Sequence, residues 1–212
     1  QDDSNQDLTN LAIDETPGTF SNLATEITNA GEELNLTRDY INTDGYATTG
    51  IPIDKNIIID GKGHTIDAQG KGRIFYPGYN AIVTLKNINF INGNGTPATG
   101  YGGAIFCYWA DCTVINCTFT NTTTSDGGGA IYSYAVNFNV INSSFTNTTV
   151  TNGDGGAIYA DSSDCKLFVV DSKFNGCQAT NRGSDIYSGG ADVTLMGNDY
   201  DGKSEYNSTD VY

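Results

Sequence analysis

Few residues in this chain have the type and spacing that enzymatic chemistry requires. The best candidates are Asp60, His64 and Asp67, which follow one another closely along the chain. Two carboxylates and a base could support glycoside hydrolysis or Ca²⁺-assisted polysaccharide cleavage, but only if they converge on one face. Asp161 and Asp164 form a weaker pair. Because no carboxylate-plus-base set recurs on one face, we expect no catalytic residues and no cleavage of uronic-acid polymers.

Metal and cysteine motifs are equally sparse. The acidic segment 199–205 lacks the full spacing of a calcium loop, so we interpret it as a solvated turn. The five cysteines, Cys107, Cys112, Cys117, Cys165 and Cys177, show no CxxC or Cys-His ligand spacing. Cys112 and Cys165 occupy one repeat position two repeats apart, which is too far for a disulfide. We therefore expect buried core cysteines, no disulfide framework, no metal and no cofactor.

The dominant feature of the sequence is a repeat of 26 to 29 residues. Its five copies share an aliphatic residue, a turn-former or small residue two positions later, and an aromatic residue three positions after that. The aromatic column is Phe90, Phe119, Phe145, Phe174 and Tyr200, with spacings of 29, 26, 29 and 26 residues. The aliphatic column is Leu85, Val114, Val140, Val169 and Leu195. Such a period indicates a stacked array, because one unit cannot bury its apolar face alone.

A second column runs in phase with the first and has the sequence Gly-Gly-Ala-Ile, ending at Ile105, Ile131 and Ile158, with a degraded copy ending at Ile186. Each period then holds three short strand signals rich in β-branched and aromatic residues. Leucine-rich repeats need Leu at several fixed offsets, and propeller blades need about 40 residues. The fold class predicted is therefore all-β: a right-handed parallel β-helix of about six to seven rungs. In that fold the turn column of Asn87, Asn116, Asn142 and Asp171 should form a hydrogen-bonded ladder.

The N-terminal part of the chain differs from the repeats. Residues 1–18 are polar and expected to be extended, and residues 19–212 form one β-helix domain. Within that domain we assign 19–50 to an N-terminal cap, 51–200 to the rungs and 201–212 to a tail. Ser21 to Ala30 is the predicted helix, with Ser21 as N-cap and Gly31 as C-cap. A helix there would cover the open end of the solenoid.

Charge excludes several classes of function. Lys plus Arg is 10 against Asp plus Glu at 25, which gives a formal net charge of −15. Phosphate binding needs a basic patch, so we expect no nucleic acid partner. No run is long and apolar enough to suggest membrane insertion. The chain begins with Gln1 rather than Met, and we interpret it as a secreted chain after removal of a signal peptide.

One resemblance rests on specific motifs. The segment 53–68, the Gly-Gly-Ala-Ile-Tyr motifs and the Val-Ile-Asn-Cys-Thr-Phe-Thr-Asn motif resemble the repeats of adhesin-like proteins of methanogenic archaea. The pairing of Gly-Gly-Ala-Ile with a Phe-rich motif is also similar to bacterial polymorphic outer-membrane proteins. The likeness spans about residues 19–200. It implies a right-handed β-helix displayed outside the cell, at the cell surface.

Two non-enzymatic functions therefore remain open. The first is adhesion to a cell-surface glycan or protein of another cell, through the surface aromatics Tyr101, Tyr108, Trp109, Tyr132, Tyr134 and Tyr159. The second is a structural subunit that assembles end to end into a homo-oligomer, filament or surface layer. Leu8, Leu11 and Ile13 are the candidate self-association residues. Of the Asn-x-Ser/Thr sequons, Asn94 and Asn207 are the candidates for glycosylation, because four others occupy repeat columns.

Overall fold

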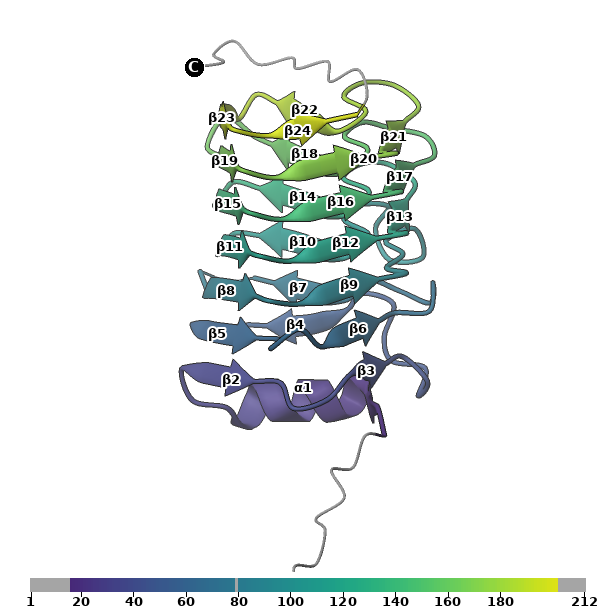
Figure 1. Ribbon diagram of the computed structural model, residues 1–212, viewed down its shortest axis with the longest axis vertical. Coiled ribbons are helices and arrows are strands. Elements are labelled where there is room, and N and C mark those ends of the chain that lie inside the picture. Colours follow the sequence, from purple (N-terminus) through teal and green to yellow (C-terminus); the bar gives the residue numbers. More distant parts are fainter. Residues whose placement is uncertain (1–15, 79, 202–212) are drawn as a thin grey trace, which may run out of the picture.

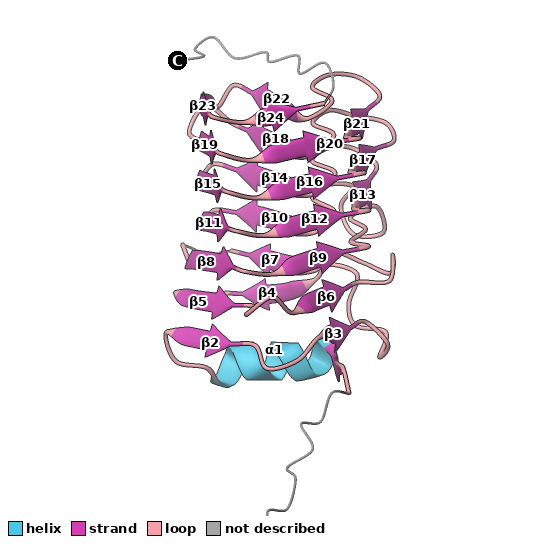
Figure 2. Cartoon of the chain, viewed as in Figure 1, coloured by secondary structure: helices cyan, strands magenta, loops and turns pink. Residues whose placement is uncertain are grey.

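The computed structural model describes residues 16–78 and 80–201. They wind into a right-handed parallel β-helix of about seven turns, which confirms the predicted fold class (Figure 1). Strands of successive turns pair in parallel and build four sheets along the solenoid, as the cartoon in Figure 2 shows. Each inner strand pairs with the strands of the turns before and after it, so each sheet has unpaired strand edges only at its two ends.

Three sheets are long, and we name each after its dominant residues. The phenylalanine sheet contains β1 (Gly18–Thr19), β3 (Tyr40–Ile41), β6 (Thr65–Asp67), β9 (Asn89–Ile91), β12 (Thr118–Thr120), β16 (Ser144–Thr146), β20 (Lys173–Asn175) and β24 (Asp199–Tyr200). The valine sheet contains β2 (Glu33–Asn35), β5 (Ile57–Asp60), β8 (Ile82–Lys86), β11 (Asp111–Ile115), β15 (Asn137–Ile141), β19 (Lys166–Val170) and β23 (Asp192–Met196). The tyrosine sheet contains β4 (Ile51–Ile53), β7 (Phe75–Pro77), β10 (Ile105–Tyr108), β14 (Ile131–Tyr134), β18 (Ile158–Asp161) and β22 (Ile186–Gly189).

A fourth, short sheet was not predicted. It contains β13 (Thr123–Thr124), β17 (Thr149–Val150) and β21 (Gln178–Ala179). Each of these strands has two residues, which is too short to produce a period-two pattern in the sequence. The short sheet begins the loops that return the chain to the tyrosine sheet, and those loops matter for the candidate site.

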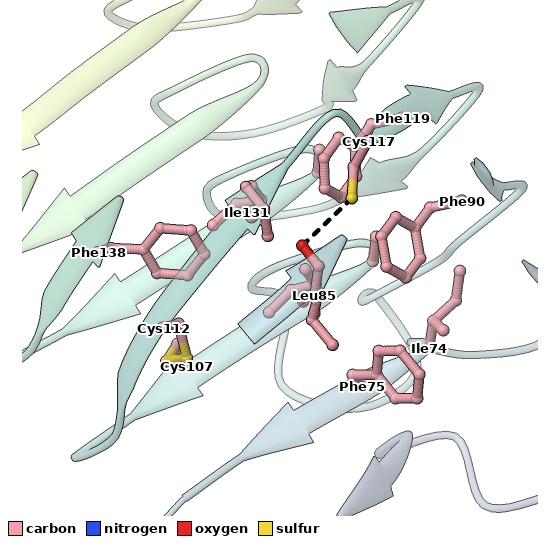
Figure 3. Close-up of a cluster of buried hydrophobic side chains, with 14 of the residues drawn as sticks. Ile74, Phe75, Leu85, Phe90, Cys107, Cys112, Cys117, Phe119, Ile131 and Phe138 are labelled. Carbon is pink, nitrogen blue, oxygen red and sulfur yellow. Dashed lines mark hydrogen bonds between the residues drawn. A yellow bond between two sulfur atoms is a disulfide. The ribbon is translucent and has the colours of Figure 1, made fainter. Parts of the chain in front are cut away.

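The predicted ladders fill the interior. Phe119, Phe145 and Phe174 stack nearly parallel, with ring centroids 4.8 and 4.9 Å apart. This spacing equals the distance between paired strands, so identical rotamers on successive turns place the rings face to face. The aliphatic column also pairs in register from turn to turn, with Val114 opposite Val140. Figure 3 shows Leu85, Phe90, Phe119 and Ile131 converging in this core.

The turn column forms the predicted ladder from Asn87 to Asn142, whereas Asp171 makes no side-chain hydrogen bond within it. Asn116 donates a side-chain hydrogen bond to Asn87 Oδ1 at 2.7 Å, and Asn142 donates one to Asn116 Oδ1 at 3.5 Å. Asn87 in turn donates to Asp60 Oδ1 at 2.9 Å. Asn87, Asn116 and Asn142 have left-handed backbone, with φ between 46° and 55°. Asn suits this position because it tolerates that conformation and bonds to its neighbours.

The N-terminal cap matches the prediction with shifted ends. Helix α1 (Phe20–Asn29) lies across the first turn and buries Phe20, Leu23 and Ile27 (Figure 1). Its N-cap is Thr19 rather than Ser21, because Thr19 and Asn22 exchange reciprocal cap hydrogen bonds. The C-cap is Ala30 rather than Gly31. The segment 19–50 also contributes β2 and β3 to the sheets, so it forms part of a rung as well as a cap.

The prediction of no disulfide is wrong for two cysteines. Cys107 and Cys112 are bonded, with Cα atoms 6.9 Å apart (Figure 3). Cysteines two turns apart are too distant to bond, whereas this pair joins β10 to β11 across one corner of a single turn. The other three cysteines, Cys117, Cys165 and Cys177, are free and buried, as expected. Burial raises the pKa of Cys117 to about 11 and that of Cys177 to about 12, which makes both thiols poor nucleophiles at neutral pH.

Candidate functional site

The predicted cluster of Asp60, His64 and Asp67 does not converge on one site. Asp60 is buried and bonds to Lys62 and Asn87. The His64 ring lies 3.1 Å from Asp39 Oδ1. Asp67 accepts hydrogen bonds from the Gln69 backbone and the Asn92 side chain. Each side chain therefore supports a turn of the solenoid.

The remaining acidic candidates are also separate. Asp161 accepts a hydrogen bond from the Tyr132 hydroxyl at 2.8 Å, whereas Asp164 is exposed. Within the acidic segment 199–205, which we expected to be a solvated turn, Asp199 and Tyr200 form strand β24 and Asp201 accepts hydrogen bonds from the Gly176 backbone. Residues 202–205 lie outside the described residues. Within residues 16–78 and 80–201 no three His, Cys, Asp or Glu side chains are grouped to hold a metal ion.

Asp60 has a structural role that predicts a pH dependence. Burial alone would raise its pKa, but hydrogen bonds from Lys62 and Asn87 and the Lys62 charge hold it well below the usual range. A carboxyl with a depressed folded pKa stabilises the fold above its unfolded pKa of about 3.9 and loses that contribution as pH falls further. We expect the difference in melting temperature between wild type and Asp60→Asn to shrink as pH falls below 4. A constant difference between pH 7 and pH 2.5 would contradict this.

Aromatic side chains cover the outer face of the tyrosine sheet. One outward position holds, turn after turn, the aromatics Tyr76, Phe106, Tyr132, Tyr159 and Tyr187. Tyr76 and Phe106 stack with centroids 5.4 Å apart, and Tyr132 lies 5.1 Å from Phe106. The alternation that points the Ile ladder inward therefore points these rings outward, as predicted for Tyr132 and Tyr159.

Much of this column is nevertheless covered. Tyr101, from the preceding loop, lies 4.6 Å from the Tyr132 ring, and Tyr132 is only 6% exposed. Arg182 covers Tyr187 at 4.3 Å and pairs with Asp154. Burial and then the bond to Asp161 raise the pKa of Tyr132 far above its ordinary value. Tyr132 is therefore not the exposed binding residue that we predicted, because the loops fold over it.

These loops can fold back because glycines begin the return to the sheet. Gly128 has φ +65°, and a Cβ placed there would lie 2.1 Å from the Ile131 carbonyl oxygen. Only glycine fits such an approach. The Gly-Gly-Ala-Ile motif is therefore explained by the turn that directs the loop over the aromatic column.

Three predicted aromatics remain accessible together at one corner, where β10 and β14 end. Tyr108 and Trp109 are 38% and 49% exposed, and Tyr134 is partly exposed. Tyr108 stacks on Tyr134 with centroids 5.4 Å apart, and Trp109 meets both rings edge-on at 6.3 Å. We call Tyr108, Trp109 and Tyr134 the aromatic corner.

Trp109 has an unusual backbone for its side chain. Its φ is +55°, in the left-handed region where bulky residues are rare. At the same position of the next turn stands Ala135, also with φ +55°, and the preceding corner holds Asn80 with φ +63°. Structural needs alone would favour Asn or Gly here. An exposed Trp in a disfavoured conformation is therefore a candidate for function.

The disulfide fixes the same turn. Cys107 and Cys112 bracket Tyr108, Trp109, Ala110 and Asp111, so the bond holds both ends of the segment. On the next turn the equivalent interior positions are Ser133 and Phe138, which fill the corner by packing. The turn that carries Trp109 is thus the one that is covalently closed, which reduces the entropy lost when its side chains bind a partner.

A small depression adjoins Trp109. It has a volume of about 210 Å³ and is lined by residues of three successive turns, among them Asn80, Ile82, Asp111 and Val136. Ile82 is 57% exposed and leads to the exposed Ile58 on the neighbouring strand β5. The aromatic corner therefore adjoins two further exposed apolar side chains, with the depression between Trp109 and Ile82.

The other predicted sites stand apart from this corner. Asn94 is half-buried, and its amide nitrogen donates to the Gly70 carbonyl at 3.0 Å, so it is not the freely exposed sequon that we expected. Asn207, Leu8, Leu11 and Ile13 lie outside the described residues. No helix among the described residues is long and apolar enough to cross a bilayer.

Sequence reasoning missed several residues around the site. Tyr76, Phe106 and Tyr187 follow the ladder positions of Phe75, Ile105 and Ile186, and extending that column by one residue would have found them. Arg73 and Arg182, which cover aromatic rings, leave no periodic signal. Searches against protein-family models, curated proteins and solved structures found no match for this chain.

Proposed function

We propose that this chain is an adhesin-like binding protein that acts outside the cell and attaches to the surface of another cell through the aromatic corner. The observation that carries the proposal is Trp109, which is half-exposed although its backbone conformation disfavours a bulky side chain. Exposed Trp and Tyr give large rigid contact area at little entropic cost. The repeats' resemblance to adhesin-like surface proteins supports the same function.

The disulfide supports an extracellular location. Disulfides persist in oxidising compartments and are rare in the cytosol. Cys107–Cys112 is buried, with both residues at most 2% exposed, which suits a permanent structural bond. A secreted or cell-surface protein would keep its Trp109 turn closed in this way.

The proposal predicts binding to intact cells. Fluorescently labelled protein should bind to members of a panel of archaeal and bacterial cells, and Trp109→Ala should reduce the bound amount at least tenfold. Met196→Ala is the matched control, because Met196 is an apolar residue with 53% exposure at the end of strand β23, in the last described turn and away from the aromatic corner. Wild type that binds no cell in the panel, or equal loss in both variants, would contradict the proposal.

A structural subunit is the second candidate, and one observation favours it. Leu195 and Tyr200 in the last described turn are only half-buried, whereas their counterparts Val169 and Phe174 are 0% and 2% exposed. Within the described residues, β22, β23 and β24 have no following strand. End-to-end stacking would also require α1 to leave the opposite end. Light scattering tests this candidate, since assembly by stacking should give species larger than a dimer.

A further inference from the structure

We propose that the aromatic corner recognises carbohydrate, and specifically neutral or amino-sugar pyranose rings. This inference rests on the proposed function and names the chemistry of its partner. Pyranose rings present a face of C–H bonds that packs on aromatic rings, while their hydroxyl groups need hydrogen-bond partners at the rim. The corner offers both kinds of contact.

The aromatic contact is well defined. The Tyr108 and Tyr134 rings are stacked at an interplanar angle of 20°, and Trp109 stands at 88° and 68° to them. Two stacked rings and one ring at a steep angle to them form a rigid three-ring cluster, in which Trp109 is the most exposed ring. The disulfide and the ring contacts hold this shape before any ligand arrives, which is the preorganisation that rigid ligands reward.

Polar groups lie at the edge of this three-ring cluster. The Trp109 indole N–H makes no hydrogen bond to another described residue. Asp111 accepts two bonds from Asn137 through Oδ1, at 2.9 and 3.0 Å, and its Oδ2 has no hydrogen-bond partner among residues 16–78 and 80–201. Asn80 lines the same depression. A donor, a carboxylate oxygen and an amide are the groups that bind sugar hydroxyls.

The size of the depression favours a single sugar unit over a protein segment. Its 210 Å³ is below the range of about 300–1,000 Å³ that encloses drug-sized ligands. Stable protein interfaces need about 800 Å² from each partner, across 20 to 30 residues. Among the described residues, five large apolar side chains are exposed, and four of them lie at or beside this corner, namely Ile58, Ile82, Tyr108 and Trp109. A glycan that places successive sugars along the corner fits this narrow surface better.

Charge narrows the class of glycan further. Asp111 is the only charged residue that lines the depression, and Asp161 occupies the strand position next to Tyr134. The formal net charge of the chain is −15. Carboxylates this close to the ligand repel the negative charges of uronic-acid and sulfated polymers, so binding of these polymers is disfavoured. An amino sugar gains instead, because its ammonium group meets a carboxylate and aromatic ring faces.

The test measures binding of three defined probes by titration calorimetry and affinity electrophoresis. Cellohexaose represents neutral sugars, a chitosan hexamer represents amino sugars, and polygalacturonate represents acidic sugars. We expect wild type to bind at least one of the first two, and polygalacturonate at least tenfold more weakly. Trp109→Ala and Trp109→Asn should each weaken binding at least tenfold, whereas Met196→Ala should leave it unchanged. Equal or tighter binding of polygalacturonate would overturn the inference.

The variants separate loss of binding from loss of fold. Ala135 and Asn80 already occupy such left-handed corner positions, so both substitutions have a precedent in this chain and the variants should melt no lower than wild type.

Failure of the carbohydrate inference can be distinguished from failure of the proposed function. Cell binding that depends on Trp109 but survives periodate oxidation of the cells, with neither neutral nor amino-sugar probe bound, would show a protein partner and overturn only the inference. No cell binding at all would overturn the proposed function.

Discussion

Replacing Phe145 by Asp should prevent the chain from folding. Phe145 is 0% exposed and lies in the stack between Phe119 and Phe174, with centroids 4.8 and 4.9 Å away. The substitution removes both ring contacts and places a carboxylate where no cation can reach it. The cost, of order 5 kcal/mol or more, is comparable with the whole stability of many domains. Circular dichroism should show loss of the β-sheet signal at 25 °C.

Two further variants locate the effect in the core. Val140→Asp changes the neighbouring aliphatic ladder and should have the same result, because Val140 is also 0% exposed. Lys173→Ala lies beside Phe174 on strand β20 but points outward, and it should shift the melting temperature by less than about 2 °C. If either Asp variant melted like wild type, the inward assignment of these ladders would be wrong.

Replacing Arg73 by Ala should produce the second-largest loss of stability. Arg73 is 1% exposed and donates hydrogen bonds to the carbonyl oxygens of Thr49, Tyr101 and Gly102 at 2.7 to 3.0 Å. Its guanidinium also covers the Phe106 ring at 4.7 Å. Burial lowers its pKa to about 10, which still leaves the group charged at neutral pH. The variant leaves these carbonyl groups without their hydrogen-bond donor and creates a cavity. We therefore expect the free energy of unfolding, measured in urea, to fall by about 3 kcal/mol.

Arg182→Ala is the matched control for this prediction. Arg182 also covers an aromatic ring of the same column, but its side chain is 52% exposed and its ion pair with Asp154 lies at the surface. Ion pairs in water contribute little, so its removal should cost clearly less. Equal losses in the two variants would mean that burial of Arg73 does not matter to the fold.

The architecture could be predicted because its determinants are local and periodic. Stacked turns place residues 26 or 29 positions apart against each other, so Phe119, Phe145 and Phe174 had to be alike to pack. The same logic revealed the Asn ladder from Asn87 to Asn142. The six or seven predicted rungs follow from counting these copies.

Features that depend on three-dimensional closure could not be predicted in the same way. The Cys107–Cys112 bond crosses a corner whose angle the sequence does not display, and periodic reasoning compared each cysteine only with other turns. Arg73 occurs once, so no column marks it as buried. The loop that carries Tyr101 covers Tyr132, and only the structure shows which outward rings are hidden. The aromatic corner was thus predicted by residue type but not separated from the covered aromatics.

The central claim, that the aromatic corner is the binding surface, has a direct spectroscopic test. Trp109 is the only tryptophan in the chain, so the tryptophan fluorescence of the protein, after subtraction of the signal of the cells alone, reports on this corner. Acrylamide should quench the free protein strongly, because the indole is 49% exposed. The account predicts that protein bound to intact cells is quenched several-fold less. Bound protein whose tryptophan is quenched as strongly as in free solution would contradict it.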